Sequence, residues 1–258
     1  MKNYNSKGTI CVHGPFNIVY AVCDISYHLN EDGSFKYVFI PNYSIIELLS
    51  SKYFQGIPGL NLDLKEKQYV RENKNPTFIS ERVPSENRED YYELLSKNGL
   101  DYMDPIKYLI NTKEQYSGDK LFVINHHRPE TVCFDNYCGH ETNSTIIKNI
   151  LSRICMGDNV IINNSVIDDS NRTTIHDVLL FLYSRSYETY KNTQKEGIEK
   201  AKIVNKYKGR KPIKVDDIQF RELLDKVKNK EITSHEAAQK LGISIDKYYR
   251  YKKLLQNK

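Results

Sequence analysis

A stretch without proline, residues 174–207, divides the chain into two parts with different sequence patterns. Its single glycine, Gly197, costs a helix interior about 1 kcal/mol and is tolerable there. We therefore expect one long helix over this stretch. Its second half is rich in Lys, Glu and Gln with little apolar stripe, which is typical of a spacer or of a helix that becomes ordered on a partner. A folded body should precede this helix and a smaller module should follow it.

The body begins with a strand pattern. Residues 9–13, 17–22 and 35–40 are rich in β-branched and aromatic side chains, and Glu31-Asp32-Gly33 is a hairpin-type turn. Apolar and polar residues alternate over residues 60–64, and this pattern predicts a further half-buried strand. Residues 88–97 fit a helix, and Asp104-Pro105 should open another that runs to about residue 116. An α+β domain with a mainly antiparallel sheet is expected for residues 1–125, with residues 120–124 as a late strand.

A small α/β segment is expected over residues 126–173. Ile146, Ile147, Ile150, Leu151 and Ile154 have helical spacing, Gly157 closes that helix, and residues 160–162 are a buried strand. The connector helix then occupies residues 174–206, and a C-terminal domain occupies residues 207–258.

Charge is distributed unevenly between these parts. The formal net charge is +5, but residues 191–258 hold 19 Lys/Arg against 9 Asp/Glu, while the remainder holds 19 against 24. A basic block beside a mildly acidic one is typical of a chain in which one module meets a polyanion. A solvated, lysine-rich helix face explains the same numbers equally well.

The C-terminal domain has the spacing of a three-helix helix-turn-helix unit, with helices over residues 216–228, 234–241 and 244–255. Thr233 with Glu236 forms a capping box, Ala238 is small where two helices would cross, and Gly242 permits a left-handed turn. The expected core consists of Ile218, Leu223 or Leu224, Val227, Ala237, Leu241, Ile243 and Tyr248.

These features predict contacts with double-stranded DNA. Residues early in a recognition helix reach base edges and later ones hold phosphates. We therefore expect Ser244, Asp246 and Lys247 to read bases, and Tyr249, Arg250 and Lys253 to contact the backbone. Lys208, Gly209, Arg210 and Lys211, followed by Pro212, form an extended basic arm narrow enough for a minor groove.

The last part of the chain contains the run Gln194-Lys195-Glu196-Gly197-Ile198-Glu199-Lys200-Ala201-Lys202, then Tyr207-Lys208-Gly209-Arg210-Lys211-Pro212, and then the three-helix unit. This order of features resembles the tail of the serine recombinases (resolvase/invertase family). The resemblance covers about residues 190–258, and residues 145–190 loosely. It implies that the long helix crosses the DNA, that the arm enters the minor groove and that the last module reads the major groove. Gly157-Asp158-Asn159-Val160-Ile161-Ile162 resembles the family's Gly-Asp strand.

The chemistry of that family is not carried over. Its Asp-Arg-x-x-Arg segment corresponds here to Asp168-Asp169-Ser170-Asn171-Arg172, with Asp169 where the first arginine belongs. The family's nucleophilic serine lies in a Tyr-x-Arg-x-Ser run on the first strand, and residues 9–13 and 17–22 contain neither arginine nor serine. Tyr183-Ser184-Arg185-Ser186 falls inside the long helix, and we interpret it as helix surface. We expect a non-enzymatic protein without catalytic residues.

A second resemblance concerns residues 35–110. This part of the chain contains the run Phe78-Ile79-Ser80-Glu81-Arg82-Val83-Pro84-Ser85-Glu86-Asn87-Arg88, followed by Leu94-Leu95 and Gly99-Leu100-Asp101. This order is similar to the N-terminal subdomain of HipA-type toxin kinases. That subdomain packs on a kinase body, which does not follow here, and the family's Leu-Leu-Pro is Arg82-Val83-Pro84. The resemblance implies a protein-interaction domain.

Other candidate sites are weaker. Cys133, Cys138 and His140 offer three zinc ligands where a structural site needs four, and the five cysteines fit reduced thiols. His13, His126 and His127 lack an interpretable carboxylate partner in the sequence. The charged residues around Pro84, Arg82 among them, fit a solvated helix entry. We expect no metal and no cofactor.

Together these patterns predict a cytoplasmic, nucleoid-associated, sequence-specific DNA-binding regulator or accessory factor. A homodimer and a protein partner for the N-terminal domain are left open. Two alternatives remain: a site-specific recombinase or nuclease with an unrecognised active site, and an antitoxin-like factor that captures a protein and is tethered to DNA.

Overall fold

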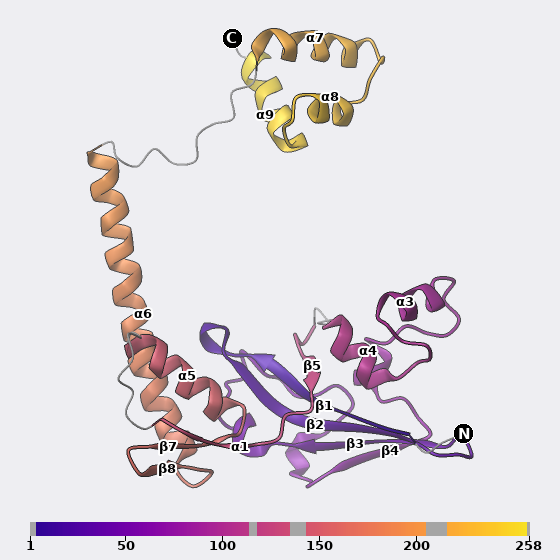
Figure 1. Cartoon of the computed structure of the whole chain (residues 1–258), viewed down its shortest axis with the longest axis vertical. Helices are drawn as coiled ribbons and strands as arrows, with labels where there is room; N and C mark the ends of the chain where they lie inside the picture. Colours follow the sequence, from indigo (N-terminus) through magenta and orange to yellow (C-terminus); the bar gives the residue numbers. More distant parts are fainter. Residues whose placement is uncertain (1–3, 114–117, 135–142, 205–215, 257–258) are drawn as a thin grey trace. The chain divides into compact units, whose positions relative to one another are not determined.

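The structure is a computed structural model that describes residues 4–113, 118–134, 143–204 and 216–256. The chain folds into two compact units, Met1–Lys191 and Asn192–Lys258 (Figure 1). The first is α+β and the second contains three short helices. No helix among the described residues is both long and apolar enough to cross a membrane.

A five-stranded antiparallel sheet forms the centre of the first unit. Its order is β4-β3-β2-β1-β5, so four consecutive strands form a meander and the fifth pairs beside β1. The strands are β1 (Tyr4–His13), β2 (Val19–Leu29), β3 (Phe35–Pro41), β4 (Tyr69–Glu72) and β5 (Phe122–Asn125). The predicted antiparallel sheet is therefore confirmed.

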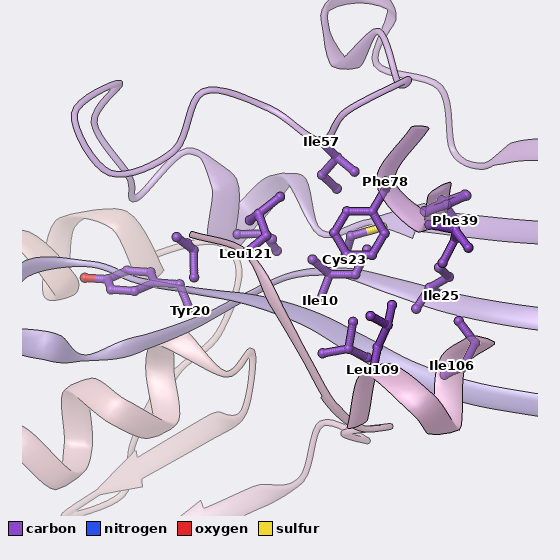
Figure 2. Packing of buried hydrophobic residues seen from close by; sticks show 14 of the residues in the cluster. Ile10, Tyr20, Cys23, Ile25, Phe39, Ile57, Phe78, Ile106, Leu109 and Leu121 are labelled. Carbon is purple, nitrogen blue, oxygen red and sulfur yellow. The ribbon is translucent and has the colours of Figure 1, made fainter. Parts of the chain in front are cut away.

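Helices and loops cover one face of this sheet. Paired residues of neighbouring strands share a face, and Ile10 of β1 pairs with Cys23 of β2 on the buried face. Figure 2 shows these side chains packed near Phe78 and Leu109. The covering elements are α1 (Tyr43–Ile46), α2 (Thr77–Ser80), α3 (Tyr91–Lys97) and α4 (Pro105–Thr112), and a 3-10 turn, η1 (Pro15–Asn17), links β1 to β2.

The start of α4 is fixed by Asp104, as the sequence predicted. Its carboxylate accepts hydrogen bonds from the backbone N–H groups of Ile106 and Lys107, both at 3.0 Å, and from the Ser6 hydroxyl of β1 at 2.9 Å. The cap therefore also attaches α4 to the sheet. α4 ends at Thr112, earlier than predicted, because Lys113 adopts a left-handed conformation.

The strand predicted over residues 60–64 is wrong. Residues 62–64 form a 3-10 turn, η2 (Leu62–Leu64), in which the Asn61 side chain accepts from the Asp63 N–H at 3.3 Å. Lys65 ends the turn with φ of 51°. Local side-chain capping thus outcompetes the alternating pattern, and the fourth strand lies further on, at β4.

A smaller sheet follows in the chain. It contains β6 (Thr131–Cys133), β7 (Asn159–Ile162) and β8 (Ser165–Ile167), in the order β6-β7-β8. β6 and β7 are parallel, with α5 (Asn143–Cys155) between them in sequence. Ile150 and Ile154 of α5 pack with Val160 and Ile167 of the strands. This confirms the helix expected around residues 146–154 and the strand over 160–162.

The long helix is α6 (Arg172–Ile203), which begins two residues before the predicted start. Residues 205–207, also predicted as helix, lie outside the described part of the chain. Its first turns are anchored to the sheet, because the Tyr20 hydroxyl lies 2.9 Å from Nε2 of buried His176. Figure 2 shows this hydroxyl turned away from the other labelled side chains. The Tyr20 ring also lies so close to Gly14 that a Cβ there would overlap it.

Candidate nucleic-acid interface

In the second unit, the end of α6 is followed by α7 (Asp217–Lys228), α8 (Ser234–Lys240) and α9 (Ile245–Gln256). Their inner side chains form a separate small core. Phe220 and Tyr248 are fully buried, with ring centroids 5.1 Å apart, and Ala237 lies beside them where two helices approach. The buried members are Phe220, Leu223, Leu224, Ala237, Ala238, Ile243 and Tyr248. This core holds α9 against α7 and α8.

One predicted core residue is misplaced. Ile218 is 73% exposed, and Phe220, which the sequence reading omitted, is buried instead. Asp216 caps α7 by accepting from the Ile218 N–H at 2.9 Å, which fixes where the helix begins. Residues 220, 223, 224 and 227 then form the inward face at helical spacing, and residue 218 lies outside it.

The start of α8 has the predicted capping box. The Thr233 hydroxyl accepts from the Glu236 N–H at 3.2 Å, and the Glu236 carboxylate accepts from the Thr233 N–H at 2.8 Å. The second bond lowers the pKa of the Glu236 carboxyl, because it stabilises the ionised form. The helix start therefore depends on a charged carboxylate.

The turn between α8 and α9 depends on Gly242. Its φ is +63°, in the left-handed region that favours glycine. The N–H groups of Gly242 and Ile243 donate to the carbonyls of Gln239 and Ala238, at 3.0 and 3.1 Å, and satisfy the end of α8. Ser244 follows, with its hydroxyl accepting from the Lys247 N–H at 3.4 Å. The two helices are thus joined by a short turn in which both flanking helix ends are hydrogen-bonded.

The outward face of α9 carries most of the predicted contact residues. Asp246, Tyr249, Arg250 and Lys253 are all exposed, and their spacing of three and four residues places them on one side of the helix. Ser244 is exposed at its start, while Lys247 is half-buried. Tyr248, between them in sequence, points into the core, and burial raises the pKa of its phenol.

The charges on this face are of mixed sign. Arg250 and Lys253 supply two cations, and the Asp246 carboxylate forms no hydrogen bond or ion pair with any residue that the structure describes. The ring of Tyr249 is 52% exposed and meets that of Tyr248 edge to face, with centroids 5.7 Å apart. The arrangement can bind phosphate oxygens at its far end and hydrogen-bond donors at its start.

The predicted arm lies outside the described residues. Lys208, Gly209, Arg210 and Lys211 all fall in the undescribed stretch 205–215, so their contribution stays a prediction. Of the three candidate zinc ligands, Cys138 and His140 lie in the undescribed stretch 135–142, whereas Cys133 is described and exposed. The part of the chain that the structure describes contains no group of three or more His, Cys, Asp or Glu that could hold a metal.

In the first unit, Arg172 has a structural role. Its side chain is buried and donates to the carbonyls of Ile154 and Asp158, at 3.0 and 2.9 Å, and pairs with Asp169 at 3.1 Å. These contacts tie the start of α6 to the end of α5. The Arg172 guanidinium thus holds neighbouring segments of the first unit together.

Two of the three histidines considered in the sequence, His126 and His127, lie near carboxylates that sequence reasoning missed. His127 Nε2 lies 2.9 Å from the fully buried Asp158, which also accepts from the Glu130 N–H at 3.0 Å. His126 Nδ1 lies 3.5 Å from Asp24. The only sequence signal was the Gly-Asp pair after α5, and the 31-residue separation from His127 hid the contact.

Arg82 also differs from its expected place in a solvated loop. It is buried, donates to the Phe78 carbonyl at 3.0 Å and pairs with Asp119. Arg88 remains exposed and pairs with Asp90 at 2.8 Å. Arg82 therefore joins α2 to the residues just before β5, because the chain brings Asp119 to it from 37 positions away.

Comparisons with protein-family models, curated proteins and solved structures find no match for this chain.

Proposed function

We propose that the protein binds specific sequences of double-stranded DNA through its second unit and acts as a transcriptional regulator or accessory factor. The observation that carries the proposal is the exposed row Asp246, Tyr249, Arg250 and Lys253 on α9. A helix with one face packed in a core and the other polar and exposed can enter a major groove, which is wide enough for an α-helix.

The connection between α8 and α9 supports this proposal. In a helix-turn-helix unit, a short turn sets the second helix across the first so that its early residues meet base edges. Gly242 allows a short turn between α8 and α9, and Ser244 and Asp246 lie at the start of α9, which supports this proposal. The basic balance of residues 191–258 provides the sequence-independent attraction to phosphates. Lys208, Gly209, Arg210 and Lys211 are proposed to add minor-groove contacts.

We also propose that the protein has no recombinase chemistry. Recombinase chemistry of this kind needs guanidinium groups that are available to the transferring phosphate. Arg172 is buried and hydrogen-bonded to backbone carbonyls, and Asp169 occupies the position of the other arginine. Absence of nicking and of a covalent DNA adduct on supercoiled DNA would support this part of the proposal, and either product would contradict it.

The DNA proposal is tested with the full chain. Sites are selected from a random-sequence pool, and affinity is then measured by fluorescence anisotropy over a salt series. We expect the logarithm of the binding constant to fall by about 0.9 per phosphate contact for each tenfold rise in salt. Charge reversal of Arg250 and Lys253 to Glu should weaken binding and reduce the slope.

The matched control is a double reversal of Lys226 and Lys228 to Glu, because both lie exposed in the last turns of α7. It changes the net charge equally and should have the smaller effect. A chain without residues 205–258 should lose salt-dependent binding. Full affinity in that truncated chain would contradict the proposal.

A further inference from the structure

A pocket in the first unit lies where several segments of the chain meet. α2, the loop from α2 into α3, and the start of α4 surround a space of about 460 Å³. Its apolar lining includes Ile79, Val83 and Met103, and its polar lining includes Ser85 and Asn87. Sites for small organic molecules have volumes of about 300–1,000 Å³ and combine apolar walls with a few polar groups. The pocket is therefore large enough for such a molecule.

Tyr91, the first residue of α3, contributes a polar group to this pocket. The residue is only 6% exposed, yet its hydroxyl forms no hydrogen bond with any residue that the structure describes. Buried polar groups nearly always have a hydrogen-bond partner, so an exception needs an explanation. Because Tyr91 lines the pocket, a bound molecule can supply the missing partner.

Glu86 brings a negative charge to the same space. Of the described residues that line the pocket, Glu86 alone carries a formal charge. Its carboxylate forms no ion pair or hydrogen bond within the described part of the chain, and Arg88, the nearest cation in sequence, pairs with Asp90 at 2.8 Å. Burial, and then the charge of Glu86, raise the pKa of the Tyr91 phenol. An ionised carboxylate and a neutral phenol thus border one pocket within electrostatic reach of each other.

These two groups determine the charge of a suitable ligand. The Glu86 carboxylate repels phosphates and other carboxylates and attracts a cation. A primary ammonium has three N–H donors and no acceptor, so it can donate both to this carboxylate and to the phenol oxygen of Tyr91. An aliphatic chain attached to the ammonium can bury apolar area against Ile79 and Met103.

We propose that this pocket binds an alkylammonium group, with the nitrogen between Glu86 and Tyr91 and the carbon chain along the apolar lining. A free aliphatic amine and a lysine side chain of another protein present the same chemistry, and the probes below distinguish the two sources. The proposal concerns the first unit alone and does not depend on DNA binding.

The test uses the full chain without DNA and three probes with the same six-carbon chain but different head groups: hexylamine, 1-hexanol and hexanoate. Dissociation constants are measured by NMR titration near pH 7, where an alkylamine is protonated. Hexylamine should bind about tenfold or more tightly than hexanol, because its hydrogen bonds are assisted by charge. Hexanoate should bind most weakly, because its charge has the same sign as that of Glu86.

Glu86→Gln removes the charge and keeps the shape of the side chain. The affinity for hexylamine should fall about tenfold or more, and that for hexanol should stay unchanged. The matched control is Glu89→Gln, which makes the same change of charge at an exposed residue outside the pocket lining. It should leave both affinities unchanged. Circular dichroism should show that both variants fold like wild type, because both side chains are exposed.

Tyr91→Phe tests the second contact. It removes only the hydroxyl, so the affinity for hexylamine should fall about fivefold. Tyr92→Phe is the control, because Tyr92 is 79% exposed and does not line the pocket. It should bind hexylamine like wild type.

A short peptide with one lysine between glycines identifies the source of the ammonium. Tighter binding of this peptide than of hexylamine, lost in Glu86→Gln, would assign the site to a partner protein. Tighter binding of hexylamine would assign it to a free amine.

A wild-type chain that binds hexylamine no better than hexanol would overturn the proposal. So would a Glu86→Gln chain that binds hexylamine as tightly as wild type does, or a preference for hexanoate. Loss of DNA binding with intact binding of hexylamine would leave this inference standing and would count against the DNA proposal alone.

Discussion

The hydroxyl of Tyr20 on β2 lies 2.9 Å from Nε2 of His176 on α6, across 156 positions of sequence. Both side chains are almost completely buried, so this bond joins the central sheet to the start of the long helix. Tyr20→Phe would leave the buried imidazole nitrogen without its partner. We expect a loss of about 1–3 kcal/mol in the free energy of unfolding, measured by urea denaturation.

Tyr92→Phe is the matched control for this change, because Tyr92 is 79% exposed. It should be nearly neutral. If both substitutions leave the unfolding midpoint unchanged, the bond contributes little to the attachment of α6.

Arg172 provides a second prediction. Arg172→Leu removes the donors that satisfy the carbonyls of Ile154 and Asp158, so the protein should lose on the order of 3 kcal/mol of stability. Thermal unfolding measures the change. Arg153→Leu is the comparison, because Arg153 is 47% exposed and its bond to Asp158 is longer, at 3.3 Å. A catalytic role would instead leave Arg172→Leu fully stable and affect only reactions on DNA.

The capping box predicts how the second unit responds to acid. The folded state lowers the pKa of Glu236 below its ordinary value of 4.5, so ionised Glu236 stabilises the fold. This contribution is complete above the ordinary pKa and is lost as the pH falls through the folded-state value. Glu236→Gln should therefore reduce the dependence of stability on pH below about 4.5, as measured by thermal melts over a pH series. An unchanged pH profile would show that the carboxylate charge is unimportant there.

Asp246 predicts a base preference, given the proposed function. A carboxylate on a surface that binds phosphates is repelled by the backbone, but it can accept from the N4 amino group of cytosine. Asp246→Asn should shift the selected base at one position toward adenine, which pairs well with a side-chain amide, with discrimination of about 1–3 kcal/mol. Selection from a random pool with both proteins is the measurement. Identical selected sites would exclude base reading by this residue.

The features that could be predicted from the sequence are local. Thr233 and Glu236 are three residues apart, and Asp104 caps the residues next to it, so residue type and spacing suffice. The three C-terminal helices follow from the same kind of signal. Periodicity also located the long helix and five of the eight strands that the structure describes, but β1 begins five residues before its predicted start and β2 ends seven residues after its predicted end.

The features that were missed depend on distant partners or on local competition. The contacts of His127 with Asp158 and of Arg82 with Asp119 cross 31 and 37 positions, and nothing in either neighbourhood identifies the partner. At residues 60–64, the Asn61 cap overrides an alternating pattern that is equally compatible with a strand. At α7, the packing of the helices decides which side of the helix faces the core. Spacing alone could not show this side, and it wrongly selected Ile218 instead of Phe220 as a core residue.

The absence of a side chain at position 14 has an effect well beyond its own loop. Because the phenol ring of Tyr20 occupies the space where a methyl group would sit, even alanine at this position would push the ring aside. The hydroxyl at the far end of that ring would move with it, and its bond to the helical histidine would lengthen. A single carbon atom added between the first two strands would thus loosen the base of α6, with both bonding residues left unchanged.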